Sequence, residues 1–220
     1  MWSGKREGRV HIRRWVMRAL ILLLALPAAT APAGKVRNDK VLVSEQTLAP
    51  GETLSLPADQ PAVLVYLDAG AVAVTPQQGE AAQGQTVRRG DAVYEPPPGA
   101  RVMNIGPSPL RIVQTRFLGP GSSVIWGQTG LAPNYKVLFE NQYARVYDIK
   151  IAAGVWEPQH THHDRVVVCL SGAELEHILP DGRKENSSLT TDEIVWRRAA
   201  THVGHNRGKT DLWAIAIEPK

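Results

Sequence analysis

Cysteine is nearly absent from this chain of 220 residues, in which Cys169 is the single one. No disulfide can therefore form within the chain, whatever compartment it occupies. Long apolar runs are missing as well, because the run at residues 19–29 is shorter than the roughly 20 residues that a membrane-spanning helix needs. After residue 33 no amphipathic helical pattern is found, so the sequence does not predict a helical fold.

An excess of charge of one sign is missing from most of the chain. The formal net charge is +4, but six basic residues and one acidic residue precede residue 19. The remainder is close to neutral. This balance argues against nucleic acid or an anionic membrane surface as a partner.

The first 33 residues have the pattern of a targeting segment. A basic region and the apolar run are followed by Ala31-Pro32-Ala33, a small-x-small sequence that ends just before Gly34. We expect a signal peptide over residues 1–33 that is removed on export. The mature protein would then be periplasmic or secreted and have no stable membrane span. Retention of the segment as a membrane anchor is the alternative.

The rest of the sequence reads as short strands separated by turns. Hydrophobic residues make up 43% of the chain, which suffices for a core, and 19 glycines and 16 prolines supply turn signals. We therefore predict an all-β fold. The strand-like segments are residues 41–48, 62–75, 110–117, 144–151, 164–170 and 212–217.

The two halves of this β region repeat one another. Residues at matched spacings of 20 and 14 occur in both halves, as Gly70, Gly90 and Asn104 and as Gly172, Asp192 and Asn206. A shared spacing along about 100 residues indicates a duplication. Turn-forming residues 119–123 mark the break between the copies. We therefore expect one barrel over residues 34–121 and a second over residues 122–220, in one compact unit.

Three histidines of the second half form a candidate metal site. His160 and His162 are two residues apart, so a strand places both imidazoles on one face, and His202 follows downstream. Three neutral imidazoles can hold a divalent transition metal, namely Zn, Mn, Fe, Co, Ni or Cu. Binding should then weaken as the pH falls through about 6.5. The alternative is that the histidines fill a polar barrel without a metal.

The first half lacks all three histidines. In an alignment from Gly51, Pro57 and Asp59 stand where the second half has His160 and His162, and Ala100 stands where it has His202. We expect the first half to be a structural partner without metal ligands.

These motifs resemble those of the cupin superfamily. Gly154, His160, His162 and Gly172 match its first motif, and His202 and Asn206 match the end of its second. The resemblance implies two jelly-roll barrels in tandem, a bicupin, with a germin-like metal site in the C-terminal barrel. Arg165 stands where the family has a glutamate ligand, so mechanisms that need that carboxylate are not implied.

Asp164 and Arg165 are rivals for the place next to the metal. If the strand continues without interruption from His160, Asp164 shares the face of the histidines. If the register is reset, Arg165 lines the barrel and favours an anionic ligand, because its fork suits carboxylates. His177 is a further candidate pocket residue, since it can point inward with Leu175 and Leu179.

Two functions fit these observations, and whether the chain is an enzyme stays open. The first is an exported metal-dependent cupin enzyme that acts on a small polar or acidic molecule. The second is a non-catalytic cupin that binds or senses a small-molecule ligand. Three retained histidines favour the first, and the missing glutamate favours the second. The substrate, the metal and the formation of a homo-oligomer are left open.

Overall fold

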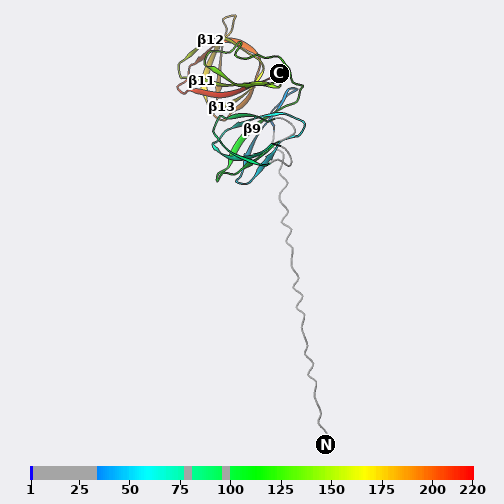
Figure 1. The fold of residues 1–220 in the computed structure, drawn as a ribbon. Coiled ribbons are helices and arrows are strands. Elements are labelled where there is room, and N and C mark those ends of the chain that lie inside the picture. Colours follow the sequence, from blue (N-terminus) through cyan, green and yellow to red (C-terminus); the bar gives the residue numbers. More distant parts are fainter. Residues whose placement is uncertain (2–33, 77–80, 96–99) are drawn as a thin grey trace. The chain divides into compact units, whose positions relative to one another are not determined.

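The computed structural model describes residue 1 and residues 34–76, 81–95 and 100–220. The predicted signal peptide over residues 2–33, with its cleavage pattern, lies outside the described residues. The described residues form eighteen strands and no helix, which confirms the all-β prediction (Figure 1). Within this part of the chain, no helix has the length and apolar character that a membrane crossing requires.

The first half contains nine strands. They are β1 (Gly34–Arg37), β2 (Val41–Leu48), β3 (Thr53–Ser55), β4 (Ala62–Tyr66), β5 (Gly70–Thr75), β6 (Gln83–Val87), β7 (Ala92–Glu95), β8 (Arg101–Asn104) and β9 (Leu110–Phe117).

The second half contains nine more. They are β10 (Tyr135–Glu140), β11 (Ala144–Ile151), β12 (Trp156–His162), β13 (Arg165–Ser171), β14 (Ala173–Ile178), β15 (Lys184–Leu189), β16 (Ile194–Arg197), β17 (Ala200–Asn206) and β18 (Leu212–Pro219).

Each half consists of one five-stranded and one four-stranded sheet, and the strand order repeats. The five-stranded sheets have the orders β1-β2-β9-β4-β7 and β10-β11-β18-β13-β16. The four-stranded sheets have the orders β3-β8-β5-β6 and β12-β17-β14-β15. Strand for strand the two halves are equivalent, as the repeated spacing predicts. Each half is a jelly-roll barrel, and Figure 1 shows the two barrels. The predicted break between residues 121 and 122 lies in the connection from β9 to β10.

The repeated asparagines make the same contacts in both halves. The buried side-chain amide of Asn104 donates to the carbonyl oxygens of Leu48 and Ser108. Asn206 donates in the same way to Ile151 and Thr210. Each asparagine thus satisfies backbone carbonyl groups where two strands end, which gives the repeated motif a physical reason.

Three apolar clusters form the core. One fills the first barrel and a second fills the second barrel. The third joins the two halves, and it draws residues from equivalent strands, β2, β4 and β9 of the first half and β11, β13 and β18 of the second. A strand such as β13 is therefore covered on both faces, which explains its continuous hydrophobic run, Val166-Val167-Val168-Cys169-Leu170.

A charged clamp also links the halves. Asp192 accepts ion pairs from two arginines of the first half, Arg89 Nη2 at 2.6 Å and Arg111 Nη1 at 2.7 Å. Its φ is +66°, the left-handed backbone region, and the equivalent Gly90 has φ +87°. Glycine adopts this conformation without a steric penalty, whereas a side chain at this position costs free energy. At Asp192, two ion pairs between the barrels therefore offset the free-energy cost of the left-handed backbone conformation.

Substituting Asp192 should separate these two contributions. We expect Asp192→Ala to lower the free energy of unfolding by about 2 kcal/mol, because it loses two partly exposed pairs and keeps the strained φ. Asp192→Gly loses the same pairs but suits the backbone, so its loss should be about 1 kcal/mol smaller. Urea denaturation measures both values. Equal losses in the two variants would show that the backbone contributes nothing here.

Candidate metal centre

The three predicted histidines come together inside the second barrel. His160 and His162 lie on β12, and His202 lies on β17 directly opposite His160. One ring nitrogen from each lies within 4.8 Å of the others. Their relative exposures are 4%, 2% and 5%, so little water reaches them. Buried imidazoles at this spacing form a group that could hold a metal ion.

A β-bulge in β12 shapes this site. The register against β17 shifts between Glu157, which pairs with Gly204, and His160, which pairs with His202. The two pairs enclose two residues on β12 and one on β17, so the extra residue puts Glu157 on the same face as the histidines. Pro158 lies within the bulge, where a missing N–H does not interrupt the ladder.

Hydrogen bonds orient His160. Its Nδ1 lies 2.8 Å from the carbonyl oxygen of Pro158 and must donate a hydrogen bond to it. The lone pair of Nε2 is therefore free to bind a metal. The Tyr135 hydroxyl lies 3.4 Å from this Nε2 and 3.2 Å from Glu157 Oε2. The other carboxylate oxygen of Glu157 accepts from Asn134 at 3.0 Å. Burial raises the pKa of Glu157, which favours its protonated form next to the histidines.

A second chain of contacts orients His162. The Tyr147 hydroxyl donates to Glu218 Oε1 at 3.1 Å, so His162 Nδ1, 3.1 Å from the same hydroxyl, must donate to it. Glu218 in turn pairs with the guanidinium of Arg145, and all four side chains are buried. His162 Nε2 is therefore left free as well. Outer partners that fix the tautomer in this way are typical of histidines that bind metals.

The surroundings of His162 and His202 favour the neutral imidazole, the form that a metal needs. Burial and the nearby charge of Arg165 hold the pKa of His162 far below its ordinary range. Burial, followed by the charge of His177, lowers the pKa of His202 to about 3. For these two ligands, protons therefore compete with a metal only at a pH below the range near 6.5 that free imidazoles predict. The donor set fits a divalent transition metal.

The same pKa shifts predict how stability changes with pH. An unfolded histidine takes up a proton as the pH falls through about 6.5, whereas folded His202, with a pKa of about 3, does not until the pH is much lower. The unfolded state then binds more protons, so the metal-free protein should lose up to about 1.4 kcal/mol per pH unit for each such group. Thermal unfolding between pH 7 and pH 4 measures the slope. His202→Ala should reduce the slope, and a flat wild-type profile would contradict the shifts.

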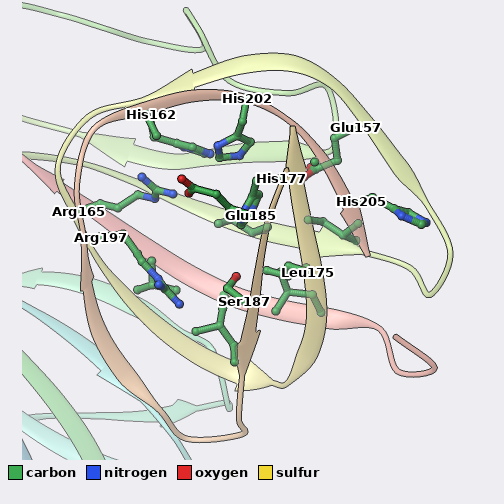
Figure 2. Close-up of a pocket in the computed structure, with 18 of the residues that line it drawn as sticks. Glu157, His162, Arg165, Leu175, His177, Glu185, Ser187, Arg197, His202 and His205 are labelled. Atoms are coloured by element: carbon green, nitrogen blue, oxygen red, sulfur yellow. The ribbon is translucent and has the colours of Figure 1, made fainter. Parts of the chain in front are cut away.

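A cavity of about 420 Å³ opens beside the histidines. Figure 2 shows His162 and His202 on one side of it and the side chains of Arg165 and Arg197 entering from another. His177 also lines the cavity, and its ring centroid lies 4.3 Å from that of His202. Apolar side chains complete the wall: Ile149, Ile151, Val167, Leu175, Leu179, Leu189 and Leu212.

Asp164 does not lie in this cavity, which corrects one of the two sequence alternatives. Strand β12 ends at His162 and β13 begins at Arg165, so Asp164 belongs to a turn. Its carboxylate accepts the backbone N–H of Ala199 at 2.7 Å, and it lies 3.8 Å from Arg198 on the surface. The turn resets the register, and Arg165 is the residue that faces the cavity.

The first barrel has apolar residues at the equivalent places, but the sequence alignment there was wrong by one residue. The ladder of β3 and β8 pairs Leu54 with Val102, and the Leu56 N–H donates to Ala100. Leu56 is therefore the counterpart of His160, in place of Pro57. The bulge adds one residue to β12 that β3 does not have, and an alignment from Gly51 cannot include it.

Glu157 and Tyr135 were not predicted from the sequence, although both contact the site. A usable signal was present for Glu157, because a proline inside a strand pattern marks a bulge, and a bulge changes which residues share a face. Tyr135 comes from β10, far from the histidines in the chain, and no local pattern points to it.

Comparisons with known proteins find a similarity of fold. No protein-family profile and no curated protein matches the sequence. Among solved structures, a cupin 2 conserved barrel domain protein from Leptotrichia buccalis is 14% identical with a TM-score of 0.58, and the match covers 90% of this chain and 93% of that one. Salicylate 1,2-dioxygenase from Pseudoaminobacter salicylatoxidans, solved as a variant, is 12% identical with a TM-score of 0.56, and the match covers 81% of this chain and 71% of that one. Oxalate decarboxylase from Bacillus subtilis, described with Mn(II) centres, is 13% identical with a TM-score of 0.53, and the match covers 82% of this chain and 69% of that one.

Proposed function

Because the chain has the cupin fold, we propose that it is an exported metal-dependent enzyme acting on a small polar or acidic molecule. One observation carries the proposal. Three buried imidazoles converge on one point, and two of them have the Nδ1 proton engaged by an outer partner. A barrel that used histidines only as filling would not need this arrangement of hydrogen bonds.

His160, His162 and His202 would hold the metal, and three protein ligands leave positions open for water or a ligand. A bound divalent metal supplies a Lewis acid and lowers the pKa of bound water. The chain itself binds and orients the molecule through the cavity walls, which also restrict access of water. Glu157 and Tyr135 are placed to exchange a proton with it, at Glu157 Oε2 and the tyrosine hydroxyl.

The second candidate is a non-catalytic cupin that binds or senses a small molecule. It is favoured by the absence of a carboxylate from the described group of metal-ligating residues. Both candidates share the cavity and the histidines, and they differ only in turnover.

Metal analysis of the purified mature protein tests the proposal. The protein is stripped with a chelator and then offered Zn, Mn, Fe, Co, Ni and Cu in turn, and bound metal is measured by mass spectrometry. We expect stoichiometric binding of at least one of the six. If none binds, the histidines are structural and the binding candidate replaces the enzyme. If a metal binds, a panel of small carboxylic acids followed by NMR distinguishes turnover from binding alone.

Export is tested separately. Full-length protein expressed with a working export route should be recovered outside the cytoplasm, and its intact mass should correspond to a chain that begins near Gly34. A full-length product in the cytoplasm would rule out this part of the proposal and leave the metal centre unaffected.

A further inference from the structure

Arg165 is a buried cation that forms no ion pair with any of the described residues. Its relative exposure is 8%, and its Nη1 contacts only the carbonyl oxygens of His163 and Arg198, both at 3.3 Å. Its Nε is buried and has no hydrogen-bond partner. A buried guanidinium ordinarily has all of its donors satisfied and a carboxylate opposite it. Arg165 has one donor unsatisfied, and the buried carboxylate on the neighbouring strand β18, Glu218, is already paired with Arg145. Arg165 also lines the cavity.

A second arginine increases the imbalance. Arg197 is the cross-strand partner of Arg165 and lines the same cavity. Like charges directly opposite each other on a sheet are destabilising. Among the described residues, no carboxylate forms an ion pair with either arginine. Two cations on adjacent strands, facing one cavity, therefore leave positive charge that an anion from outside the chain can balance.

The acidic residues that line the cavity are engaged elsewhere. Glu157 is held by Asn134 and Tyr135 on the other side of the histidines. Glu185, on the edge strand β15, has a largely exposed side chain and lies 3.7 Å from Arg183. His177 adds no negative charge. The groups that face Arg165 from β14, β15, β16 and β17 are thus positive or neutral apart from the exposed Glu185. On β18, the neighbouring strand, the carboxylate of Glu218 is bound by Arg145 and Tyr147.

The remaining walls indicate what kind of anion fits. Ser187 Oγ is buried without a partner and lines the cavity, which provides one further hydrogen bond. Most of the other side chains in the wall are aliphatic. A planar carboxylate on an apolar stem matches both features, because the guanidinium fork binds a carboxylate with two parallel hydrogen bonds.

We propose that Arg165 and Arg197 form a carboxylate-binding subsite, so that the cavity takes a small organic acid whose carboxylate lies against Arg165 while the rest of the molecule extends between the aliphatic wall and the histidines. The inference rests on the proposed function for the role of the metal, but the subsite consists of residues of the chain alone. It is therefore present in the metal-free protein as well.

Butyrate and its neutral isostere butyramide are suitable probes. Their dissociation constants are measured by NMR titration of the full mature protein, with and without metal. Wild type should bind butyrate at least about ten-fold more tightly than butyramide, since a hydrogen-bonded charge pair replaces a neutral contact. Arg165→Met should remove this preference, and Arg165→Lys should retain only part of it, because it keeps the charge and loses the fork.

Arg198→Met is the matched control. Arg198 is close in sequence to Arg197, but its side chain is 84% exposed and contacts Asp164. It should keep the preference for butyrate within about two-fold, because an exposed charge is screened. If Arg165→Met and Arg198→Met lost the preference for butyrate equally, the overall positive charge of the region would explain the preference. That result would overturn the subsite. Tighter binding of inorganic phosphate than of butyrate would overturn the choice of carboxylate.

Misfolding is excluded by measuring thermal unfolding of each variant. Arg165→Met should unfold at the same or a higher temperature than wild type, because it removes a buried charge without a partner. The two proposals can also fail separately. Butyrate binding that depends on Arg165 in a protein that binds no metal keeps the subsite and ends the enzyme proposal. If the protein binds metal stoichiometrically but binds butyrate and butyramide equally well, the enzyme proposal stands and the subsite is overturned.

Discussion

His202→Ala is expected to weaken metal binding by at least about 100-fold, because two protein ligands seldom hold a divalent metal well. His202 is the best position for this test, since it lies alone on β17 and its removal leaves the His160–His162 strand and both outer hydrogen-bond chains in place. The measurement is a competition titration against a chelator of known affinity, with metal content after dialysis as a second readout.

His205→Ala is the control for that result. His205 lies on the same strand, but its ring stacks on the exposed Trp156 at a centroid distance of 3.9 Å and does not belong to the group of three. Its removal should change metal affinity by less than about two-fold. Stoichiometric, tightly bound metal in His202→Ala would mean that the ion is held by other residues.

Glu218→Gln is expected to cause the largest loss of stability, about 3–5 kcal/mol in the metal-free protein. It leaves the guanidinium of Arg145 fully buried without a counter-charge, and breaking a buried ion pair from one side carries this penalty. Metal affinity should also fall, by about 10- to 100-fold, because Glu218 supports His162 through Tyr147. Urea denaturation and the chelator competition measure the two effects.

An exposed pair of the same kind provides the comparison. Arg183 and Asp181 are also in contact, but their side chains are 68% and 54% exposed, so Asp181→Asn should change the free energy of unfolding very little. If Glu218→Gln were no more destabilising than Asp181→Asn, the buried pair would have no special role. The double variant Arg145→Met, Glu218→Leu should regain much of the stability and not the metal affinity, which separates folding from support of the site.

Several features of the fold and the site could be predicted because they follow from local rules. The alternation of a strand places His160 and His162 on one face, and the structure shows both buried in the second barrel. The repeated asparagines, Asn104 and Asn206, satisfy equivalent carbonyl groups, so their spacing reflects the shared architecture of the two halves. A run of buried β-branched residues predicted β13, whichever neighbours cover its two faces.

The rest could not be predicted, because it depends on irregularities and on long-range pairing. The turn before Arg165 decides whether Asp164 or Arg165 enters the cavity, and nothing in the sequence fixes where that turn begins. The bulge at Pro158 brings Glu157 to the histidines and displaces the alignment of the two halves by one residue. Glu218 lies 73 residues from Arg145, and pairing across such a distance appears only once β11 and β18 lie side by side.

The apolar cluster between the barrels has a consequence for how the protein behaves on dilution. Its members come from matching strands of the two halves, as in the contact between two identical subunits, where each surface meets its own copy. Between separate chains, the occupancy of such a contact depends on protein concentration. Here the connection from β9 to β10 joins the two surfaces covalently. The barrel with the histidines therefore stays in contact with the first barrel at any protein concentration. A chain cut in that connection should regain the dependence on concentration.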